Sequence, residues 1–401
     1  MSTAEPANTS LEVPDQEPTT RDENSAASPA GPGPEATEET KVTKAKEEDP
    51  ASSTAEDKTA VSGSTPTGAE ETQQGPNKSK EEEPQTGFEG EKVVIVTGAN
   101  SGIGLIAAEL FAKNGYDTII ACRSEEKATA AIAEIRRKVP NGKVTFMKLD
   151  LGSLHSVREF VDAFHATGKP LHILCNNAGL TTGFSVKQRS ETEDKFEMTF
   201  GVNHLGHFLL TNLLMEDLKK TARCHGEARI VSTSSLLHDP DRTRGKKAHL
   251  DFDNLMMDKP GTFDGELAYR NSKLANCAFS VELSRRLEGT NITTNTICPG
   301  FIPSTGIGRN ETLGTKIKLA FVIPLLKLFG VTRTVQHGGG LLYDVATNPQ
   351  WKGVTGRHFS DFNEILSSEE SREVEVGKRL WEVSADLTKC PEAKTFGVQA
   401  S

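Results

Sequence analysis

Residues 1–88 almost lack aromatic side chains, since Phe88 is the only one. The same segment holds 10 of the 19 prolines of this 401-residue chain, together with 19 acidic and 7 basic residues. A stretch so poor in apolar side chains cannot bury enough surface to offset the cost of ordering its backbone, about 1–2 kcal/mol per residue. Residues 1–88 are therefore predicted to form a disordered acidic tail.

The remaining residues, 89–401, lack an excess of either charge, with 37 acidic and 39 basic residues. The formal net charge of −10 thus comes from the tail. A nearly neutral segment without a basic face argues against a nucleic-acid partner. Its length matches one α/β domain with insertions.

Long apolar runs and paired cysteines are also absent. The strongest apolar run, residues 319–326, is eight residues long and includes Pro324, so it is too short to span a bilayer. The N-terminal residues have neither the basic and apolar start of a signal peptide nor the acid-poor composition of a transit peptide. The cysteines are scattered, which indicates reduced thiols, a cytoplasmic protein and no zinc site: Cys122, Cys175, Cys224, Cys277, Cys298 and Cys390.

From residue 91 onward, short Val- and Ile-rich runs alternate with amphipathic runs of helical length. Strands are expected at residues 93–97, 118–122, 144–149, 171–175, 229–233, 292–298 and 354–359. Helices are expected at residues 103–113, 125–138, 154–166, 193–219, 267–287, 335–347 and 368–387. This alternation predicts a doubly wound parallel sheet, a Rossmann fold, as a single domain over residues 89–390. Residues 391–401 are expected to be flexible.

The first predicted strand runs directly into a glycine-rich turn, Thr97-Gly98-Ala99-Asn100-Ser101-Gly102-Ile103-Gly104, and a helix follows at once. Glycines let the backbone turn sharply and approach a pyrophosphate, which the N-terminus of the helix then stabilises. Without its strand and helix, such a turn would equally fit an ordinary structural role. The context favours a dinucleotide site.

The second predicted strand ends in Ala121-Cys122-Arg123, where an NAD enzyme usually carries an acid for the ribose hydroxyls. A guanidinium pairs well with a 2′-phosphate, so Arg123 favours NADP(H) over NAD(H). A surface arginine that caps the strand end is the alternative. Asp117 starts this strand and so lies at the wrong end to serve the ribose.

Four motifs follow one another along the chain: the glycine-rich turn, Asn177-Ala178-Gly179, Tyr269-x-x-x-Lys273 and Pro299-Gly300. In this order and spacing, residues 91–360 resemble the short-chain dehydrogenase/reductase superfamily. The resemblance implies a cofactor-binding set that comprises Gly98, Asn100, Ser101, Gly102, Ile103, Gly104, Arg123, Asp150, Leu151, Asn177, Ala178, Gly179, Tyr269, Lys273, Pro299, Gly300 and Ile302.

The same resemblance implies four catalytic residues. Tyr269 would be the acid/base, and Lys273 its electrostatic partner, which also holds the nicotinamide ribose. Ser235 would orient the carbonyl, with Ser234 as the alternative serine. Asn203 would serve as a structural and proton-relay residue.

The chemistry of carbonyl reduction independently supports the Tyr269–Lys273 pair. Hydride adds to carbon, so the oxygen must be stabilised and protonated as charge develops. A tyrosine with a pKa of about 10 is a poor acid/base at neutral pH unless a nearby cation favours its phenolate. Lys273, four residues later on the same helical face, is expected to supply that cation. Taken singly, such a tyrosine usually packs and such a lysine is usually solvated.

His204 and His207 are spaced three residues apart on a predicted helix, as metal ligands often are. No carboxylate or cysteine nearby completes a ligand set, so we interpret both as structural and expect no metal.

Residues 201–208, 269–276 and 378–384 resemble one branch of the superfamily, which contains retinol dehydrogenases, the WW-domain-containing oxidoreductase and light-dependent protochlorophyllide reductase. Protochlorophyllide reductases carry a cysteine directly after the Pro-Gly pair, where this chain has Phe301. The resemblance therefore implies a retinol-dehydrogenase-like enzyme that interconverts a lipophilic alcohol and its aldehyde or ketone. A protochlorophyllide-reductase-like enzyme is an alternative, and a non-catalytic NADP(H)-sensing protein that recruits partners through its tail is another.

Residues 317–326 fall where a lid covers the substrate in this fold, and they are mostly apolar. An apolar lid would favour a lipophilic substrate. Ordinary core packing fits the same residues, as does shallow insertion into a membrane surface, which would make the protein peripheral to a membrane. Family precedent also suggests a homodimer through the helices around Asn203 and Tyr269.

Overall fold

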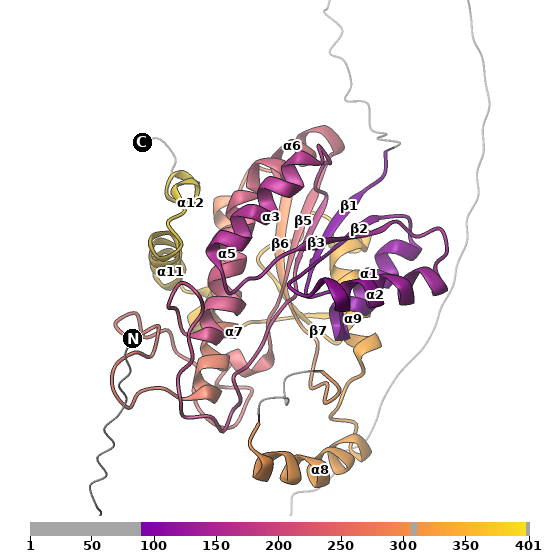
Figure 1. Cartoon of the computed structure of the whole chain (residues 1–401). Helices are drawn as coiled ribbons and strands as arrows, with labels where there is room; N and C mark the ends of the chain where they lie inside the picture. Colours follow the sequence, from indigo (N-terminus) through magenta and orange to yellow (C-terminus); the bar gives the residue numbers. More distant parts are fainter. Residues whose placement is uncertain (1–89, 306–310, 398–401) are drawn as a thin grey trace, which may run out of the picture. The chain divides into compact units, whose positions relative to one another are not determined.

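A single mixed sheet organises the chain (Figure 1). The structure, a computed structural model, describes residues 90–305 and 311–397, so the predicted tail of residues 1–88 lies outside the described residues. Within the described residues, eight strands pair in the order β3-β2-β1-β4-β5-β6-β7-β8, all parallel except β8. They are β1 (Val93–Thr97), β2 (Asp117–Cys122), β3 (Val144–Lys148), β4 (Ile173–Asn176), β5 (Ala228–Thr233), β6 (Ile292–Cys298), β7 (His358–Ser360) and β8 (Asn363–Ile365).

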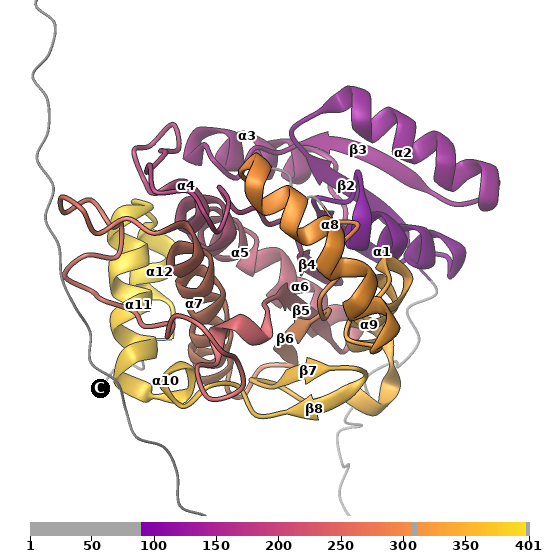
Figure 2. The same ribbon diagram turned by 90° about the horizontal axis from the view of Figure 1, so that it is seen from below.

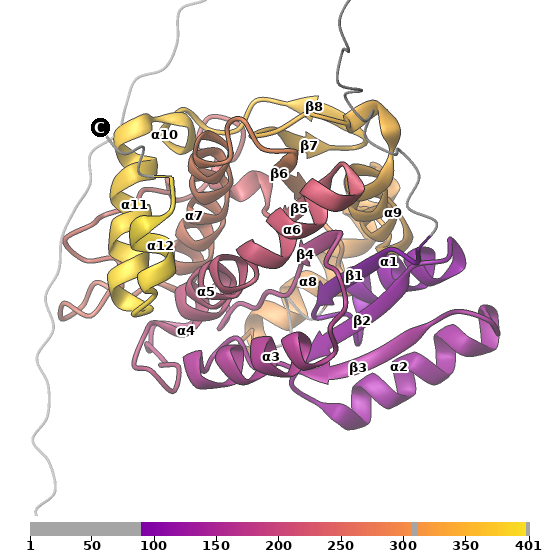
Figure 3. The same ribbon diagram turned by 90° about the horizontal axis from the view of Figure 1, so that it is seen from above.

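Helices cover both faces of the sheet, as the alternating pattern predicted (Figure 3). One face carries α1 (Gly102–Lys113), α2 (Glu125–Lys138) and α9 (Val335–Thr347). The other carries α3 (Leu154–Ala166), α5 (Gly206–Leu213), α6 (Met215–His225) and α7 (Gly265–Arg286). Shorter or outlying helices are α4 (Met198–Phe200), α8 (Leu313–Leu328), α10 (Glu369–Arg372), α11 (Val374–Leu387) and α12 (Pro391–Thr395).

Strand β1 shows why the sheet is buried on both sides. Its residues alternate between two apolar cores, with Val93 and Ile95 in the core beneath α3, α5 and α7, and Val94 and Val96 in the core beneath α1, α2 and α9. Successive strand side chains point to opposite faces, so a strand covered twice needs an unbroken apolar run. The expectation of a doubly wound sheet is confirmed.

The strand order reverses beside β1, which lies between β2 and β4. The loops that leave the carboxyl ends of β1 and β4 therefore diverge to opposite faces and leave a crevice between them, the place where open α/β sheets bind ligands. Thr97 ends β1 and Asn176 ends β4, so the motifs that follow both strands meet here.

Three predicted elements differ from the structure. The helix expected over residues 193–219 begins only at Met198, because Lys195 has a left-handed φ of 69° and Glu191 pairs with Glu197 in an isolated bridge. The strand expected over residues 354–359 begins only at His358, since the left-handed Gly356 donates to Thr294 O instead of extending the ladder. The helix expected over residues 368–387 is split between α10 and α11.

The C-terminal helices lie along α5 and α7 (Figure 3). Trp381 of α11 contacts Phe208 of α5 edge-on and stacks on Phe279 of α7, with ring centroids 5.1 Å and 5.7 Å away. The segment expected to be flexible from residue 391 begins with α12, whose Ala393 is fully buried. This chain therefore covers part of the outer face of α5 and α7 itself, and a homodimer through those helices stays a prediction.

Candidate active site

The glycine-rich turn and the strand β4 motif form a tight backbone cradle. A Cβ on Gly98, whose φ is +67°, would lie 2.9 Å from Ala178 Cα. A Cβ on Gly104 would lie 2.6 Å from Asn177 Nδ2 and 2.8 Å from Gly98 O. Side chains are thus excluded on both sides of the turn, as a close approach of the backbone to a pyrophosphate requires.

The N-terminus of α1 opens into this cradle. Its capping residue, Ser101, makes no side-chain hydrogen bond to the helix, and the first turn carries no acid. The positive end of the helix dipole therefore remains available to a phosphate. Gly102 completes the turn with a φ of +60°. The residues present fit a dinucleotide.

Thr97 joins β1 to the β4 motif, a role that the sequence did not reveal. Its Oγ1 accepts hydrogen bonds from the backbone N–H groups of Asn177 and Ala178, both at 2.9 Å. The Asn177 amide donates in return to Thr97 O at 2.8 Å. These hydrogen bonds hold the two loops together. Thr97 itself is fully buried between them.

Arg123 stands at the rim of a cavity of about 450 Å³ that also contains Arg189. The guanidinium of Arg189 is already bound, to Met256 O and to Glu191. Arg123 is exposed, and no hydrogen bond or ion pair engages its side chain within residues 90–305 and 311–397. It is therefore the guanidinium at this cavity that remains available to an anion. The full lining is Arg123, Leu180, Thr182, Val186, Gln188, Arg189, Ser190 and Met198.

Asn203 lies in a π-helical turn, Gly201–Leu205, between α4 and α5. Its side chain is fully buried and makes two hydrogen bonds to the backbone of Leu180. It accepts from the N–H at 2.8 Å and donates to the carbonyl at 2.9 Å. It also donates to Ser272 Oγ at 3.0 Å. Asn203 thus fixes the chain just after Gly179, and π-turns of this kind recur at functional sites.

Tyr269 and Ser235 meet at the carboxyl end of β5. Tyr269 lies in α7, is 5% exposed, and shares a hydrogen bond with the Ser235 hydroxyl. Burial raises the pKa of Tyr269 above its ordinary value, and the hydrogen bond from Ser235 only partly opposes this. The ring of Phe184 packs against the Tyr269 ring with centroids 5.4 Å apart. The phenol is therefore neutral at physiological pH and carries a proton.

The two adjacent serines face different ways. The Ser234 hydroxyl donates to Lys273 O at 2.8 Å and is buried against α7. Ser235 is only half-buried, and its Oγ accepts from Leu237 N at 3.3 Å while it contacts Tyr269. Only Ser235 faces the phenol.

Lys273 is buried beside Tyr269, and the pKa of the phenol is nevertheless raised, because burial has the largest effect on it. The ammonium lies 5.6 Å from the centroid of the tyrosine ring and donates to Thr233 O at 3.0 Å. Burial lowers the pKa of Lys273 to about 8. A Cβ on Gly179 would lie 3.2 Å from Lys273 Nζ and 3.4 Å from Asn203 Oδ1, so both side chains lie against this glycine. The sequence motif predicted that the two side chains lie close together, and they do. It did not predict that burial would raise the pKa of the tyrosine.

The other predicted cofactor contacts divide into loop and packing positions. Gly300 takes a left-handed φ of +79°. Ile302 is buried against Gly338 of α9, where an added Cβ would lie 2.9 Å from the Ile302 side chain. Asp150 accepts from Gly152 N at 2.9 Å, and the backbone of Leu151 packs against Gly206 of α5. The backbones of these residues shape the loops after β3 and β6, while the side chain of Ile302 anchors its loop in the core.

The two histidines near Asn203 have structural partners. His207 bridges Thr97 Oγ1 at 2.9 Å and Asn203 O at 3.1 Å, which ties the dinucleotide turn to the π-helical turn. His204 contacts Ser384 Oγ of α11 at 2.9 Å. Across the described ranges, no three His, Cys, Asp or Glu side chains cluster as metal ligands do.

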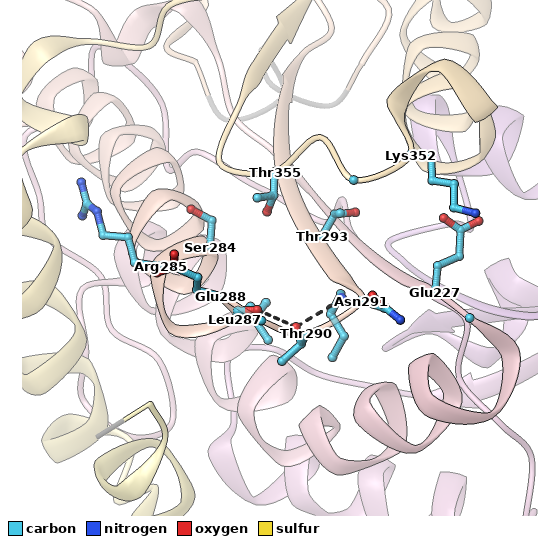
Figure 4. A pocket seen from close by; sticks show the side chains of 14 residues that line it. Glu227, Ser284, Arg285, Leu287, Glu288, Thr290, Asn291, Thr293, Lys352 and Thr355 are labelled. Carbon is cyan, nitrogen blue, oxygen red and sulfur yellow. Dashed lines mark hydrogen bonds between the residues drawn. The ribbon is translucent and has the colours of Figure 1, made fainter. Parts of the chain in front are cut away.

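A second cavity, of about 470 Å³, opens at the opposite edge of the sheet, beside the amino ends of β5 and β6 (Figure 4). Its lining includes Glu227, Arg285 and Lys352, and the Thr290 hydroxyl donates to Leu287 O at 2.6 Å. None of the predicted catalytic residues lines it, so the chemistry belongs to the carboxyl edge.

Known proteins are similar to this chain in sequence. A family model described as short chain dehydrogenase matches residues 92–241. Human retinol dehydrogenase 11 is 39% identical over 300 residues, which cover 75% of this chain and 86% of the relative. The chain belongs to the short-chain dehydrogenase/reductase superfamily. The chloroplastic short-chain dehydrogenase TIC 32 B of Brassica napus is also 39% identical, over 73% of this chain and 87% of the relative.

Solved structures share the fold of this chain. An uncharacterized protein from Mycobacterium paratuberculosis superposes with a TM-score of 0.55 at 28% identity, over 74% of this chain and 93% of the other. Actinorhodin polyketide ketoreductase with NADPH gives 0.52 at 20% identity, over 67% and 95%. The relatives confirm the expected retinol-dehydrogenase-like branch. As a member of this superfamily, the chain is an NAD(P)-dependent oxidoreductase that acts on CH–OH and C=O groups.

Proposed function

We propose that this chain reduces a lipophilic aldehyde or ketone to its alcohol with NADPH, using Tyr269 as the proton donor. The observation that carries the proposal is the meeting of a buried, neutral phenol with the Ser235 hydroxyl beside the dinucleotide cradle. The dinucleotide, when bound, supplies the hydride. All other groups that the reaction needs are side chains of this chain.

The substrate oxygen needs a proton as negative charge develops on it. The raised pKa of Tyr269 keeps its hydroxyl proton at neutral pH, so the phenol can hydrogen-bond to the carbonyl and then transfer that proton. The Ser235 hydroxyl beside it offers a second hydrogen bond that orients the carbonyl. With a pKa of about 8, Lys273 is mostly an ammonium at neutral pH, and its positive charge stabilises the tyrosinate left behind.

Asn203 and Ser234 act on this centre through other residues. Asn203 holds Leu180 and Ser272, and so positions the loop after Gly179 beside the Lys273 ammonium. The hydrogen bond from the Ser234 hydroxyl to Lys273 O fixes the α7 backbone at Lys273. In this proposal, Ser234 and Asn203 are positioning residues rather than proton donors.

Arg123 favours the phosphorylated cofactor. It follows β2, which pairs with β1 at the switch point, and its guanidinium at the cavity has no ion-pair partner among the described residues. Hydrogen bonds between charged groups contribute about 1.5–3 kcal/mol, so a 2′-phosphate here would select NADPH over NADH by roughly 10- to 100-fold.

A lipophilic substrate is supported by the wall next to Tyr269. Phe184 packs on the tyrosine ring, and its backbone N–H donates to Glu311 Oε1 at 2.5 Å, just before α8. An aromatic wall held in place this way favours an apolar ligand. The names of the similar retinol dehydrogenases point to the same substrate class.

The test mixes the purified full chain with NADPH and a panel of retinoid, steroid and aliphatic carbonyl compounds, and follows oxidation of the nicotinamide by absorbance. Removing a general acid typically costs roughly 10²–10⁴-fold, so Tyr269→Phe should lose that much in kcat. Tyr343→Phe, which changes a phenol in α9 away from the carboxyl edge, is the matched control and should keep the parent rate.

Equal turnover by the parent and Tyr269→Phe would refute the proton-donor role. Tight NADPH binding without oxidation by any carbonyl of the panel would favour the non-catalytic, sensing alternative. Turnover that requires light would favour the protochlorophyllide-reductase-like alternative.

A further inference from the structure

Helix α8 (Figures 1 and 2) lies at the outside of the molecule. Among the described helices, it exposes the most large apolar side chains. It lies beyond the carboxyl ends of the strands and touches the rest of the molecule through few residues. Leu313, Phe321 and Leu328 are 76%, 79% and 79% exposed. Burying one such side chain is worth about 1.5–3 kcal/mol, so a surface of this kind marks an interaction site.

Five of the six exposed large apolar side chains of α8 share one side of the helix, and Val322 lies apart from them. At 3.6 residues per turn, positions three and four apart lie above one another. The outward stripe, which we call the α8 apolar face, consists of Leu313, Ile317, Phe321, Leu325 and Leu328. The partly buried residues Thr315, Ile323 and Leu326 lie on the opposite side. Core packing, one of the three alternatives for this stretch, is therefore excluded for the outward side chains.

Lysines border the α8 apolar face on both sides. Lys316 and Lys327 lie along one edge by helical position, Lys318 lies along the other, and all three are exposed. No acidic residue occurs from 312 to 343 in the sequence. An apolar stripe with a basic border is the pattern of helices that lie in the interface of a membrane with anionic lipids.

A second copy of the chain is a poorer occupant of the same face. A twofold contact would bring Lys316, Lys318 and Lys327 against the same lysines of the other copy, and no acid on α8 offsets them. Anionic lipid headgroups supply the missing negative charge. Screening limits the reach of charge to about 8 Å at physiological salt, so the adjacent lysines outweigh the chain's net charge of −10.

We propose that the α8 apolar face inserts into a lipid leaflet that contains anionic phospholipids, with the three lysines at the headgroups. In the described segments, none of the helices combines the length and apolar character needed to cross a bilayer, so α8 would lie in the interface. The contact joins the leaflet to the catalytic centre through three steps. Glu311 precedes α8 and binds Phe184 N and the Ser185 hydroxyl, and Phe184 packs on Tyr269.

The experiment measures co-sedimentation of the purified full chain with vesicles of phosphatidylcholine alone and of equimolar phosphatidylcholine and phosphatidylserine. The parent should bind the anionic vesicles more tightly. Each lysine near an anionic surface contributes about 1 kcal/mol, or roughly fivefold, so the triple Lys316→Gln, Lys318→Gln, Lys327→Gln variant should bind them on the order of 100-fold more weakly. Phe321→Ser combined with Leu325→Ser should weaken binding to the anionic vesicles by at least roughly tenfold, by loss of buried apolar area.

Matched controls separate α8 from the rest of the surface. Leu366→Ser changes an exposed leucine beyond β8, and a triple Lys127→Gln, Lys220→Gln, Lys259→Gln variant removes the same charge elsewhere. Both should bind as the parent does, and thermal unfolding should show every variant folded.

Equal binding of parent and α8 variants, or equal binding to both vesicle types, would overturn the proposal. So would a dimer, detected by light scattering without lipid, that dissociates in the Phe321→Ser, Leu325→Ser variant while vesicle binding is unchanged. Carbonyl reduction is not part of the readout, so a failure here leaves the proposed reaction untouched.

Discussion

Replacing Lys273 by methionine should stabilise the fold even though it removes a proposed catalytic residue. The ammonium is 3% exposed, and burial lowers the pKa of Lys273 from 10.5 to about 8. Each tenfold loss of proton affinity corresponds to about 1.4 kcal/mol, so keeping this group charged in the folded state costs about 3 kcal/mol at neutral pH. Methionine has a similar length and no charge.

The substitution also loses one hydrogen bond, from Lys273 Nζ to Thr233 O, worth about 1 kcal/mol. Thr233 O keeps its second donor, Asn276 Nδ2 at 3.2 Å, so no buried carbonyl is left without a partner. The net effect expected for Lys273→Met is a gain of about 2 kcal/mol in the free energy of unfolding at neutral pH.

The pH dependence identifies the cause of the gain. Below pH 8 the lysine is charged in both states and the cost of burial is complete; between pH 8 and 10.5 the folded state releases its proton first, so the cost falls as pH rises. The advantage of Lys273→Met should therefore shrink to near zero by about pH 9.5.

The assay is urea unfolding of the parent and Lys273→Met, without added dinucleotide, at several pH values. Lys220→Met, a change at an exposed lysine of α6, is the matched control and should shift the free energy of unfolding by less than about 0.5 kcal/mol at every pH. A Lys273→Met protein that is less stable than the parent at neutral pH, or a gain that does not vary with pH, would refute the reasoning.

Three further results are expected. Arg123→Ala should weaken NADPH binding by roughly 10- to 100-fold and leave NADH binding nearly unchanged, as measured by fluorescence titration; equal losses for both cofactors would contradict the 2′-phosphate contact. Ser235→Ala should lower kcat while Ser234→Ala chiefly lowers stability, by about 1 kcal/mol, and steady-state kinetics with thermal unfolding would show if the roles are reversed. Trp381→Ala should destabilise the fold by about 3–5 kcal/mol in urea unfolding, and a much smaller loss would mean that α11 is not part of the core.

Local chemistry explains why much of the fold could be predicted. The helix expected over residues 125–138 has these bounds because Ser124 caps it, accepting from Lys127 N, and acids occupy its first turn. Strand β1 and the turn after it could also be predicted, because a short apolar run followed directly by glycines is typical of a buried strand that ends in a tight turn. The family motifs added the pairing of Tyr269 with Lys273, which the structure brings together in α7.

What escaped prediction depends on contacts distant in sequence. Nothing in the residues around Phe184 signals that its ring packs on Tyr269, 85 positions away along the chain. The π-helical turn at Asn203 lies inside an unbroken amphipathic pattern, so the sequence predicted a plain helix there. The sequence also placed a cation near Tyr269 but could not show that burial has the larger effect on the tyrosine pKa. Helix α8 was missed because residues 317–326 are mostly apolar and include Pro324, which together obscure the helical period.

The docking of α11 and α12 also affects how the protein is made. Their residues Trp381 and Ala393, with Cys390 between the two helices, belong to the same apolar core as Phe208 and Phe279. Helices α5 and α7 are synthesised well before this last segment. The outer face of those helices therefore stays uncovered until synthesis is nearly complete. The nascent protein therefore exposes an apolar surface during synthesis, and chaperones should bind mainly after α7 and before α11 has been synthesised.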